Sequence, residues 1–231
     1  SSHVIKGGGT DLTRADGSVK RGDIEAQRST VNLQALKETQ RKAEAARLEE
    51  LKEKVNNVLA SNPKLAALRG QLRLDMTRDG LRIQIIDENS RPMFDSGSAI
   101  VKPYMRDLLR DIGEVLAEVP NRLTLEGHTD ALPFGSGDRG YSNWELSSDR
   151  ANASRRELIS GGLPEDHVLR VQGLASSTLF DPKDPGSPVN RRISIIVMNR
   201  DAEDRLLRTE PGAEEAVSEN NLPSTSVSPV R

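Results

Sequence analysis

The chain has 231 residues, with 33 Lys and Arg against 35 Asp and Glu, a formal net charge of −2 and no cysteine. Proteins that bind the nucleic-acid backbone usually carry a basic excess, so this balance argues against nucleic acid as a partner. The lack of cysteine excludes disulfide frameworks, Cys-ligated zinc and thiol catalysis. Only 35% of the residues are hydrophobic, which predicts that a large part of the chain lies outside a folded core.

Both ends of the chain have the composition of unfolded segments. Residues 1–28 contain Gly7-Gly8-Gly9 and few apolar side chains, so we predict a flexible linker there. Residues 201–231 contain seven acidic residues and three prolines, and we predict a disordered tail. The chain begins at Ser1 without Met and has no apolar run as long as a membrane span. We therefore expect a fragment or processed form of a longer protein.

A long amphipathic helix is predicted over residues 29–62. The segment from Val31 to Ala60 contains no Gly or Pro, and it carries Glu-to-Lys pairs four residues apart, which stabilise a helix modestly. Its narrow apolar seam is formed by Leu48, Leu51, Val55 and Val58, with Leu33 and Leu36 earlier in the chain. Such a seam suits docking on the chain's own domain, pairing with a second copy, or a spacer.

The next segment, residues 63–200, is predicted to form one compact domain. Apolar residues alternate over 72–76 and 81–85 around Asp79-Gly80, the pattern of a β-hairpin. A helix is predicted from Pro103 to about residue 119, because apolar residues recur there at helical spacing and Pro120 follows.

A strand over 123–128 is followed by Ser142-Asn143-Trp144-Glu145, a capping box that starts a helix ending at Gly161-Gly162. Two further strands are predicted over 168–173 and 193–198. The order β-β-α-β-α-β-β predicts an α/β fold of two layers, and the domain is large enough to fold alone.

Signals of catalysis are weak. The three histidines at positions 3, 128 and 167 lack metal-ligand spacing, and no G-x-S-x-G, P-loop or dinucleotide-binding motif is present. Glu126 and Asp130 lie near one strand end, and glycosidases use carboxylate pairs. Acidic pairs are common at strand ends, so we predict neither an enzyme nor a cofactor, and no metal site.

Asp130 and Arg150 are more informative. Arg150 lies seven residues after Asn143 on the same side of a predicted helix, in a stripe shared with apolar positions. A partly buried guanidinium without a partner is costly. One interpretation is a structural salt bridge between Asp130 and Arg150. The other is that both bind a zwitterion, with Asp130 on the ammonium and Arg150 gripping the carboxylate bidentately.

Several motifs in residues 90–200 together resemble the OmpA-like peptidoglycan-binding domain. They are Gly127-His128-Thr129-Asp130, Asn143-x-x-Leu146-Ser147-x-x-Arg150-Ala151, Gly173 and Asn190-Arg191-Arg192. The resemblance implies a two-layer α/β sandwich with a mixed sheet. It also implies a non-catalytic site for the diaminopimelate residue of the peptidoglycan stem peptide, which presents an ammonium and a carboxylate.

The same resemblance implies the residues of that site. Asp130 would meet the ammonium and Arg150 the carboxylate, and Thr129 and Asn143 match positions that hydrogen-bond the same group. The remaining matches are Asp95, Arg191 and Arg192, of which one of the two arginines would face the groove. The loop 131–141 is longer than is usual in the family, and it would cover the groove or change the distance between Asp130 and Arg150.

A narrower resemblance is carried by Leu132-Pro133-Phe134 and by the stretch from Tyr141 to Ser147. These residues resemble the branch of the family that anchors the flagellar motor stator to the cell wall, and the long charged helix fits that branch. The resemblance implies a homodimer and a channel-forming stator partner subunit. It also implies a periplasmic location, with a single inner-membrane span that would lie upstream of this sequence.

Two alternatives stay open, an outer-membrane OmpA-like protein or lipoprotein anchor, and a peptidoglycan hydrolase. For a stator anchor we add one hypothesis about the long helix. It would be packed on the domain in the idle stator and released when the domain reaches the wall, because Thr39-Gln40-Arg41 interrupts its apolar seam.

Overall fold

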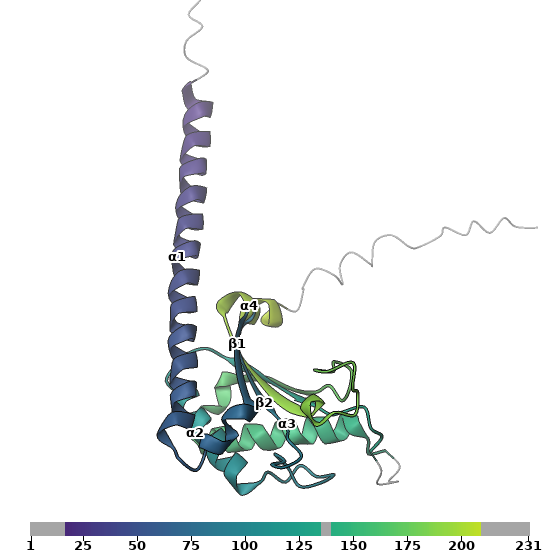
Figure 1. Cartoon of the computed structure of the whole chain (residues 1–231). Coiled ribbons are helices and arrows are strands. Elements are labelled where there is room, and N and C mark those ends of the chain that lie inside the picture. Colours follow the sequence, from purple (N-terminus) through teal and green to yellow (C-terminus); the bar gives the residue numbers. More distant parts are fainter. Residues whose placement is uncertain (1–16, 135–139, 209–231) are drawn as a thin grey trace, which may run out of the picture. The chain divides into compact units, whose positions relative to one another are not determined.

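The computed structural model describes residues 17–134 and 140–208, and Figure 1 shows the chain. The chain divides into two units, residues 1–46 and 47–231, and helix α1 (Gly17–Ser61) contributes to both. The helix begins at Gly17 rather than at residue 29, so the second part of the predicted linker is helical. No proline lies between residues 17 and 61, and an established helix extends readily into neighbouring residues. Residues 1–16 of the predicted linker lie outside the described residues.

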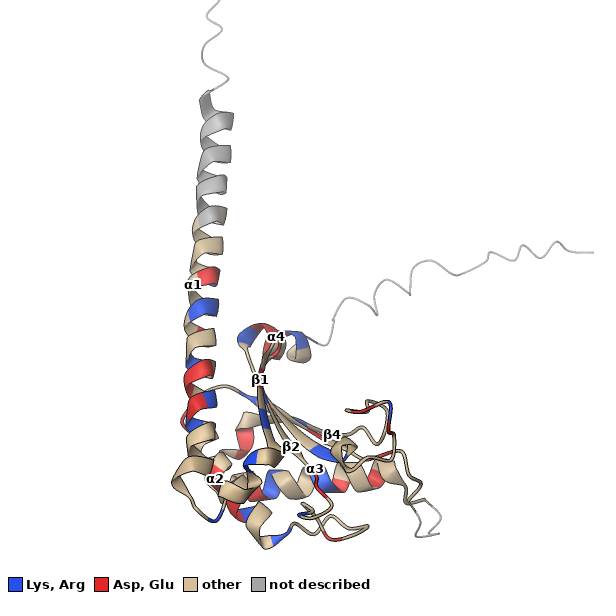
Figure 2. Ribbon diagram, viewed as in Figure 1, with Lys and Arg blue, Asp and Glu red and all other residues tan. Residues whose placement is uncertain are grey.

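In the part of α1 that belongs to the first unit, Leu33 and Leu36 are both more than half exposed. Acidic and basic residues are both present along the coloured ribbon of this helix (Figure 2).

The second unit contains a five-stranded mixed sheet with strand order β1-β2-β5-β3-β4. The strands are β1 (Leu72–Thr77), β2 (Gly80–Ile86), β3 (Leu123–His128), β4 (Val168–Gly173) and β5 (Arg192–Met198). The pair β3–β4 is parallel and the other pairs are antiparallel. The predicted hairpin is confirmed, with Thr77 opposite Gly80 at the turn. The predicted α/β class with a mixed sheet is confirmed as well.

Helices α2 (Pro103–Leu116) and α3 (Asn143–Ser160) pack together on one face of the sheet. The predicted capping box is present, because Ser142 Oγ accepts the Trp144 amide and Glu145 accepts the Ser142 amide. Short 3₁₀ turns occupy Ala66–Gln71, Glu165–His167 and Pro188–Asn190. None of the helices in the described ranges is both long and apolar enough to cross a membrane.

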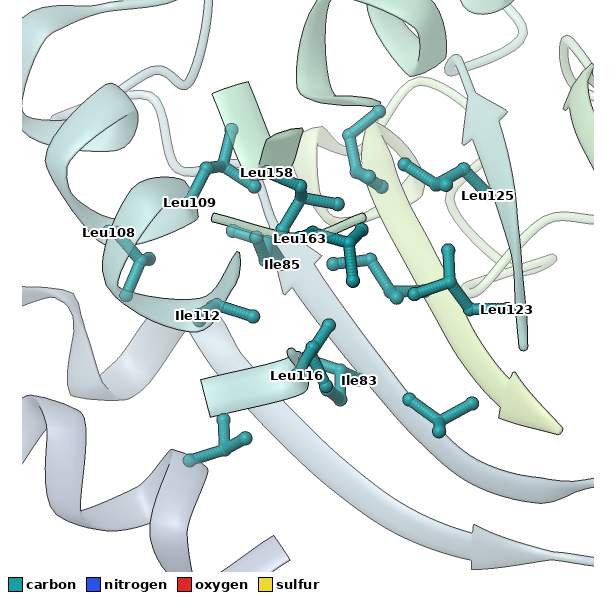
Figure 3. Packing of buried hydrophobic residues seen from close by; sticks show 14 of the residues in the cluster. Ile83, Ile85, Leu108, Leu109, Ile112, Leu116, Leu123, Leu125, Leu158 and Leu163 are labelled. Carbon is teal, nitrogen blue, oxygen red and sulfur yellow. The ribbon is translucent and has the colours of Figure 1, made fainter. Parts of the chain in front are cut away.

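The hydrophobic core lies between this helical layer and the sheet, and Figure 3 shows its centre. It also includes four side chains from the last part of α1, which are Leu48, Leu51, Val55 and Leu59. Each of these four is at most 2% exposed. Residues 47–61 of α1 are thus an integral part of the domain, which agrees with docking of the predicted seam on the chain's own domain.

Helix α4 (Arg200–Leu207) corrects the prediction of a tail that is disordered from residue 201. The Asn199 side chain caps its N-terminus by accepting the Ala202 amide, and Ala202 is buried. A capped turn with a buried small residue is enough to order this short segment. The rest of the predicted tail, residues 209–231, lies outside the described residues.

Candidate functional site

A groove of about 820 Å³ lies where β3 ends, beside the first two turns of α3. The segment between β2 and α2 forms its opposite wall. The groove is lined by Asp87, Pro92, Phe94, Ser96, Gly97, Lys102, Thr129, Asp130, Leu132, Pro133, Phe134, Asn143, Leu146, Arg150 and Arg191. Five of the seven residues predicted for the site are therefore brought together, namely Thr129, Asp130, Asn143, Arg150 and Arg191.

Gly127 explains how α3 comes so close to the end of β3. A Cβ built on Gly127 would lie 2.0 Å from the backbone oxygen of Ser147 in α3, a distance that no side chain tolerates. Because glycine has no Cβ, the strand and the helix make backbone contact at this point. The residues that follow the strand, Thr129 and Asp130, are thereby placed beside Asn143 and Arg150.

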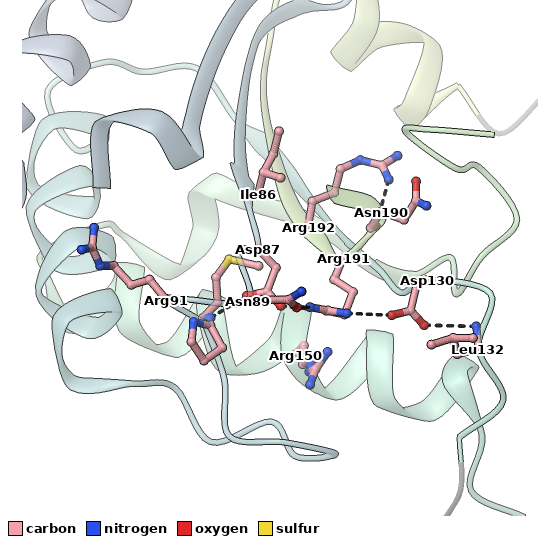
Figure 4. Close-up of polar contacts among 12 residues, drawn as sticks. Ile86, Asp87, Asn89, Arg91, Asp130, Leu132, Arg150, Asn190, Arg191 and Arg192 are labelled. Carbon is pink, nitrogen blue, oxygen red and sulfur yellow. Dashed lines mark hydrogen bonds and ion pairs between the residues drawn. The ribbon is translucent and has the colours of Figure 1, made fainter. Parts of the chain in front are cut away.

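Asp130 is 7% exposed, and its carboxylate has two partners. One oxygen accepts the Leu132 amide at 3.1 Å, and the other accepts Nη1 of Arg191 at 2.9 Å. A carboxylate has about four acceptor positions, so Asp130 can still accept hydrogen bonds from a ligand in the groove. Figure 4 shows the carboxylate between Arg191 and Leu132.

Arg150 makes no ion pair with any residue in the described part of the chain, although it is only 9% exposed. Its Nε donates to the backbone oxygen of Ser98 at 2.9 Å, and its guanidinium lies over the Phe94 ring, 4.9 Å from the centroid. Burial lowers the pKa of Arg150, and the negative charge of Asp87 opposes that shift. The structural salt bridge between Asp130 and Arg150 is thus replaced by the pair Asp130–Arg191.

Thr129 and Asn143 complete the floor of the groove near Asp130. The Thr129 hydroxyl is buried and has no hydrogen-bond partner among the described residues. The Asn143 side-chain amide donates to the backbone oxygen of Leu132 at 2.8 Å, which ties the start of α3 to the loop after β3. Both residues line the groove, as the sequence resemblance implies.

Of the two neighbouring arginines, Arg191 lines the groove and Arg192 does not. Consecutive side chains in extended backbone point in opposite directions, and Figure 4 shows Arg192 directed away from the row formed by Asp87, Arg191 and Asp130. Arg192 instead donates to the backbone oxygens of Asn190 and Thr178. Burial lowers its pKa to about 10. Arg192 therefore has a structural role on the other face of the sheet.

Asp95 also lies outside the residues that line the groove. Its carboxylate forms an ion pair with Lys102, and its backbone amide donates to Ile100 at 3.0 Å. The next two residues, Ser96 and Gly97, do line the groove. Asp95 thus shapes the wall of the groove through Lys102 rather than facing it.

The carboxylate pair that a glycosidase would need is not assembled from Glu126 and Asp130. Glu126 lines a separate depression and bonds Gln172 at 2.8 Å, whereas Asp130 lines the groove. Glu126 and Asp130 therefore do not face one bond of a common substrate. In the described ranges, no group of three or more His, Asp and Glu side chains is placed to hold a metal ion.

Two groove residues that contact the predicted arginines were not found from the sequence. Phe94 supports the Arg150 guanidinium, and Asp87 binds Arg191. Asp87 directly follows the apolar strand β2, and Asp130 likewise lies just beyond the end of a strand. Of the long loop 131–141, residues 135–139 lie outside the described residues.

The chain is similar to known proteins. The model of the OmpA family matches residues 93–192. Motility protein B of Escherichia coli K12 is 49% identical over 207 residues, which make up 90% of this chain and 64% of that protein. The truncated flagellar export/assembly protein LafU of the same strain is 37% identical over 166 residues, or 72% of this chain and 76% of the relative.

The fold is shared with a solved structure. The crystal structure of a MotB-like protein from Desulfovibrio vulgaris has a TM-score of 0.52 and 17% sequence identity, and it covers 66% of this chain and 96% of its own. The chain spans less than two thirds of the length of motility protein B. The sequence resemblance to the OmpA family is confirmed, and the chain belongs to that family.

Proposed function

We propose that the groove binds the zwitterionic end of diaminopimelate in the peptidoglycan stem peptide, and that this binding anchors a flagellar stator to the cell wall. The observation that carries the proposal is the state of Arg150, a buried cation with no ion pair in the described part of the chain. A buried guanidinium of this kind favours a carboxylate ligand.

Asp130 is proposed to bind the ammonium group of the ligand. It keeps free acceptor positions, and it lies in the same groove as Arg150. An ammonium and a carboxylate on one carbon match an anionic and a cationic side chain that face one groove. Asn143 and the buried Thr129 hydroxyl supply further polar atoms beside Asp130.

Binding of one such group is expected to be modest. A hydrogen bond to a charged group is worth about 1.5–3 kcal/mol, so loss of the Arg150 contacts weakens binding about 10- to 100-fold. Retention at the wall would then come from avidity, because two copies of the domain engage one polymer. The exposed Leu33 and Leu36 on α1 support pairing with a second copy of the chain.

The same proposal gives the location and partners of the whole protein. The similarity to motility protein B extends over 90% of this chain, and it supports a periplasmic domain of an inner-membrane protein that works with a channel-forming stator subunit. It favours a stator anchor over an outer-membrane or lipoprotein anchor. The binding is non-catalytic, and cell wall incubated with the chain is expected to release no muropeptides. Release that is abolished by Glu126→Gln would support a hydrolase instead.

The decisive experiment compares two arginines of α3. Arg150→Gln is expected to abolish co-sedimentation with purified peptidoglycan, and Asp130→Asn is expected to do the same. Arg155→Gln is the matched control, because Arg155 lies on the same helix and pairs with Glu165 outside the groove. All three variants are expected to keep the thermal unfolding profile of the wild type. Co-sedimentation of Arg150→Gln at the wild-type level would contradict the proposal.

A further inference from the structure

Arg191 faces the groove, but each of its three nitrogens already donates to a protein oxygen. Nε donates to Asp87 at 2.7 Å, Nη1 to Asp130 at 2.9 Å and Nη2 to Asn89 at 3.1 Å. Figure 4 shows these contacts as one row, with Arg191 between Asp87 and Asp130. Arg191 is thus held in place by the protein, and it joins two carboxylates that line the groove, Asp87 and Asp130.

Asp87 holds the other end of this row. It follows β2 directly, it is 7% exposed, and its Oδ2 accepts Arg191 Nε. Its Oδ1 accepts the Met93 amide at 2.7 Å. Its own amide donates to the backbone oxygen of Arg191 at 2.9 Å, so side chain and backbone join the same two segments.

The Met93 contact links Asp87 to the second half of the groove. Met93 begins the segment that carries Phe94 and Ser98, which are the two residues that contact the Arg150 guanidinium. The Asp87 carboxylate therefore contacts Arg191, which binds Asp130, and also the segment from Met93, which contacts Arg150. No other residue in the described ranges makes hydrogen bonds both to Arg191 and to this segment.

We infer that Asp87 is a positioning residue that sets the relative placement of Asp130 and Arg150, and hence the recognition of an amino-acid zwitterion. The inference rests on the proposed function of the groove. Each Asp87 oxygen binds a protein donor, Arg191 Nε or the Met93 amide, and through these two contacts Asp87 acts on Arg191 and on the Met93 segment. A site of two opposite charges needs its groups within about 0.5 Å of the productive geometry.

The charges support this role. Burial opposes the charge of Arg191, but its hydrogen bonds to Asp87 and Asp130 outweigh burial and raise its pKa. Removal of the Asp87 charge leaves Arg191 with one carboxylate partner instead of two. The Arg191 guanidinium is then held only by Asp130 and Asn89, so the orientation of Asp130 is less tightly fixed.

The test measures binding of a tripeptide that ends in meso-diaminopimelate, by titration calorimetry with the full chain. Asp87→Asn is nearly isosteric and can still accept the Met93 amide, and we expect its affinity to fall about tenfold. Asp75→Asn is the matched control, because it removes the same charge from β1, where Asp75 pairs with Arg82. The control is expected to bind like the wild type.

Two readouts separate positioning from general stability. The double variant Asp87→Asn/Asp130→Asn is expected to bind no more weakly than Asp130→Asn alone, because Asp87 acts through Asp130. The Arg191 Nε–H signal in NMR spectra of the free protein is expected to shift in Asp87→Asn and to stay unchanged in Asp75→Asn. Independent losses in the double variant would overturn the inference.

The outcomes also distinguish this inference from the proposed function. No binding of the tripeptide to the wild type would refute the function itself. Normal binding to both the wild type and Asp87→Asn would refute only the role of Asp87. Should Asp87→Asn fail to fold, Arg191→Lys carries the test, because a lysine keeps the charge but cannot bridge Asp87 and Asp130. Wild-type affinity of that variant would equally overturn the inference.

Discussion

Leu51 and Leu36 lie on the same helix and differ in burial, which makes them a matched pair for testing where α1 joins the domain. Leu51 is 1% exposed within the core, and Leu36 is 55% exposed. Truncation of a buried leucine to alanine costs about 2–5 kcal/mol, because transfer free energy is lost and a cavity is left behind. The same truncation on an exposed helix face changes stability by about 0.5 kcal/mol or less.

For a domain of about 150–250 residues, 1 kcal/mol shifts the melting temperature by about 2–4 °C. A loss of about 3 kcal/mol in Leu51→Ala therefore lowers the melting temperature by about 6–12 °C, and Leu36→Ala leaves it nearly unchanged. The measurement is thermal unfolding of the full chain, followed by far-ultraviolet circular dichroism and by calorimetry. Equal melting temperatures for the two variants would refute the assignment of residues 47–61 to the core.

Two further predictions concern β3. Gly127→Ala places a Cβ 2.0 Å from the backbone oxygen of Ser147. It is therefore expected to lower stability by about 1–3 kcal/mol and to weaken diaminopimelate binding. Gly70→Ala is the control, because its Cβ would meet the nearest atom only at 3.6 Å. Burial lowers the pKa of His128 below its ordinary value of 6.5, so the unfolded chain takes up this proton first and stability falls as the pH drops below about 6.5. His128→Gln is expected to flatten that fall in melting temperature, and an unchanged pH profile would contradict the assignment.

The elements of the domain were predictable because their signals are local. Alternation over residues 72–85 marks the hairpin, and Ser142 and Glu145 mark the first turn of α3. These signals involve only residues a few positions apart in the chain, so they can be recognised without knowledge of the tertiary structure. The start of α1 was not predictable in the same way, because helix extension toward Gly17 depends on cooperativity rather than on a cap.

Five of the seven residues predicted from the resemblance line the groove, but their pairing was not predictable. One of the two interpretations of Asp130 and Arg150 was a salt bridge, and the structure pairs Asp130 with Arg191 instead. That choice depends on the register of β5 against β3 and on the placement of Asp87, more than one hundred residues earlier in the chain. Contacts of this separation leave no local pattern in the sequence.

The burial of the last part of α1 bears on the hypothesis that this helix is packed on the domain in one state and released in another. Leu48, Leu51, Val55 and Leu59 are each at most 2% exposed, and full burial of such a side chain is worth about 1.5–3 kcal/mol. Release of all four would cost about 6–12 kcal/mol, which is comparable to the whole stability of a typical domain at about 5–15 kcal/mol. Undocking of residues 47–61 would therefore unfold the domain, which argues against release of this part of the helix.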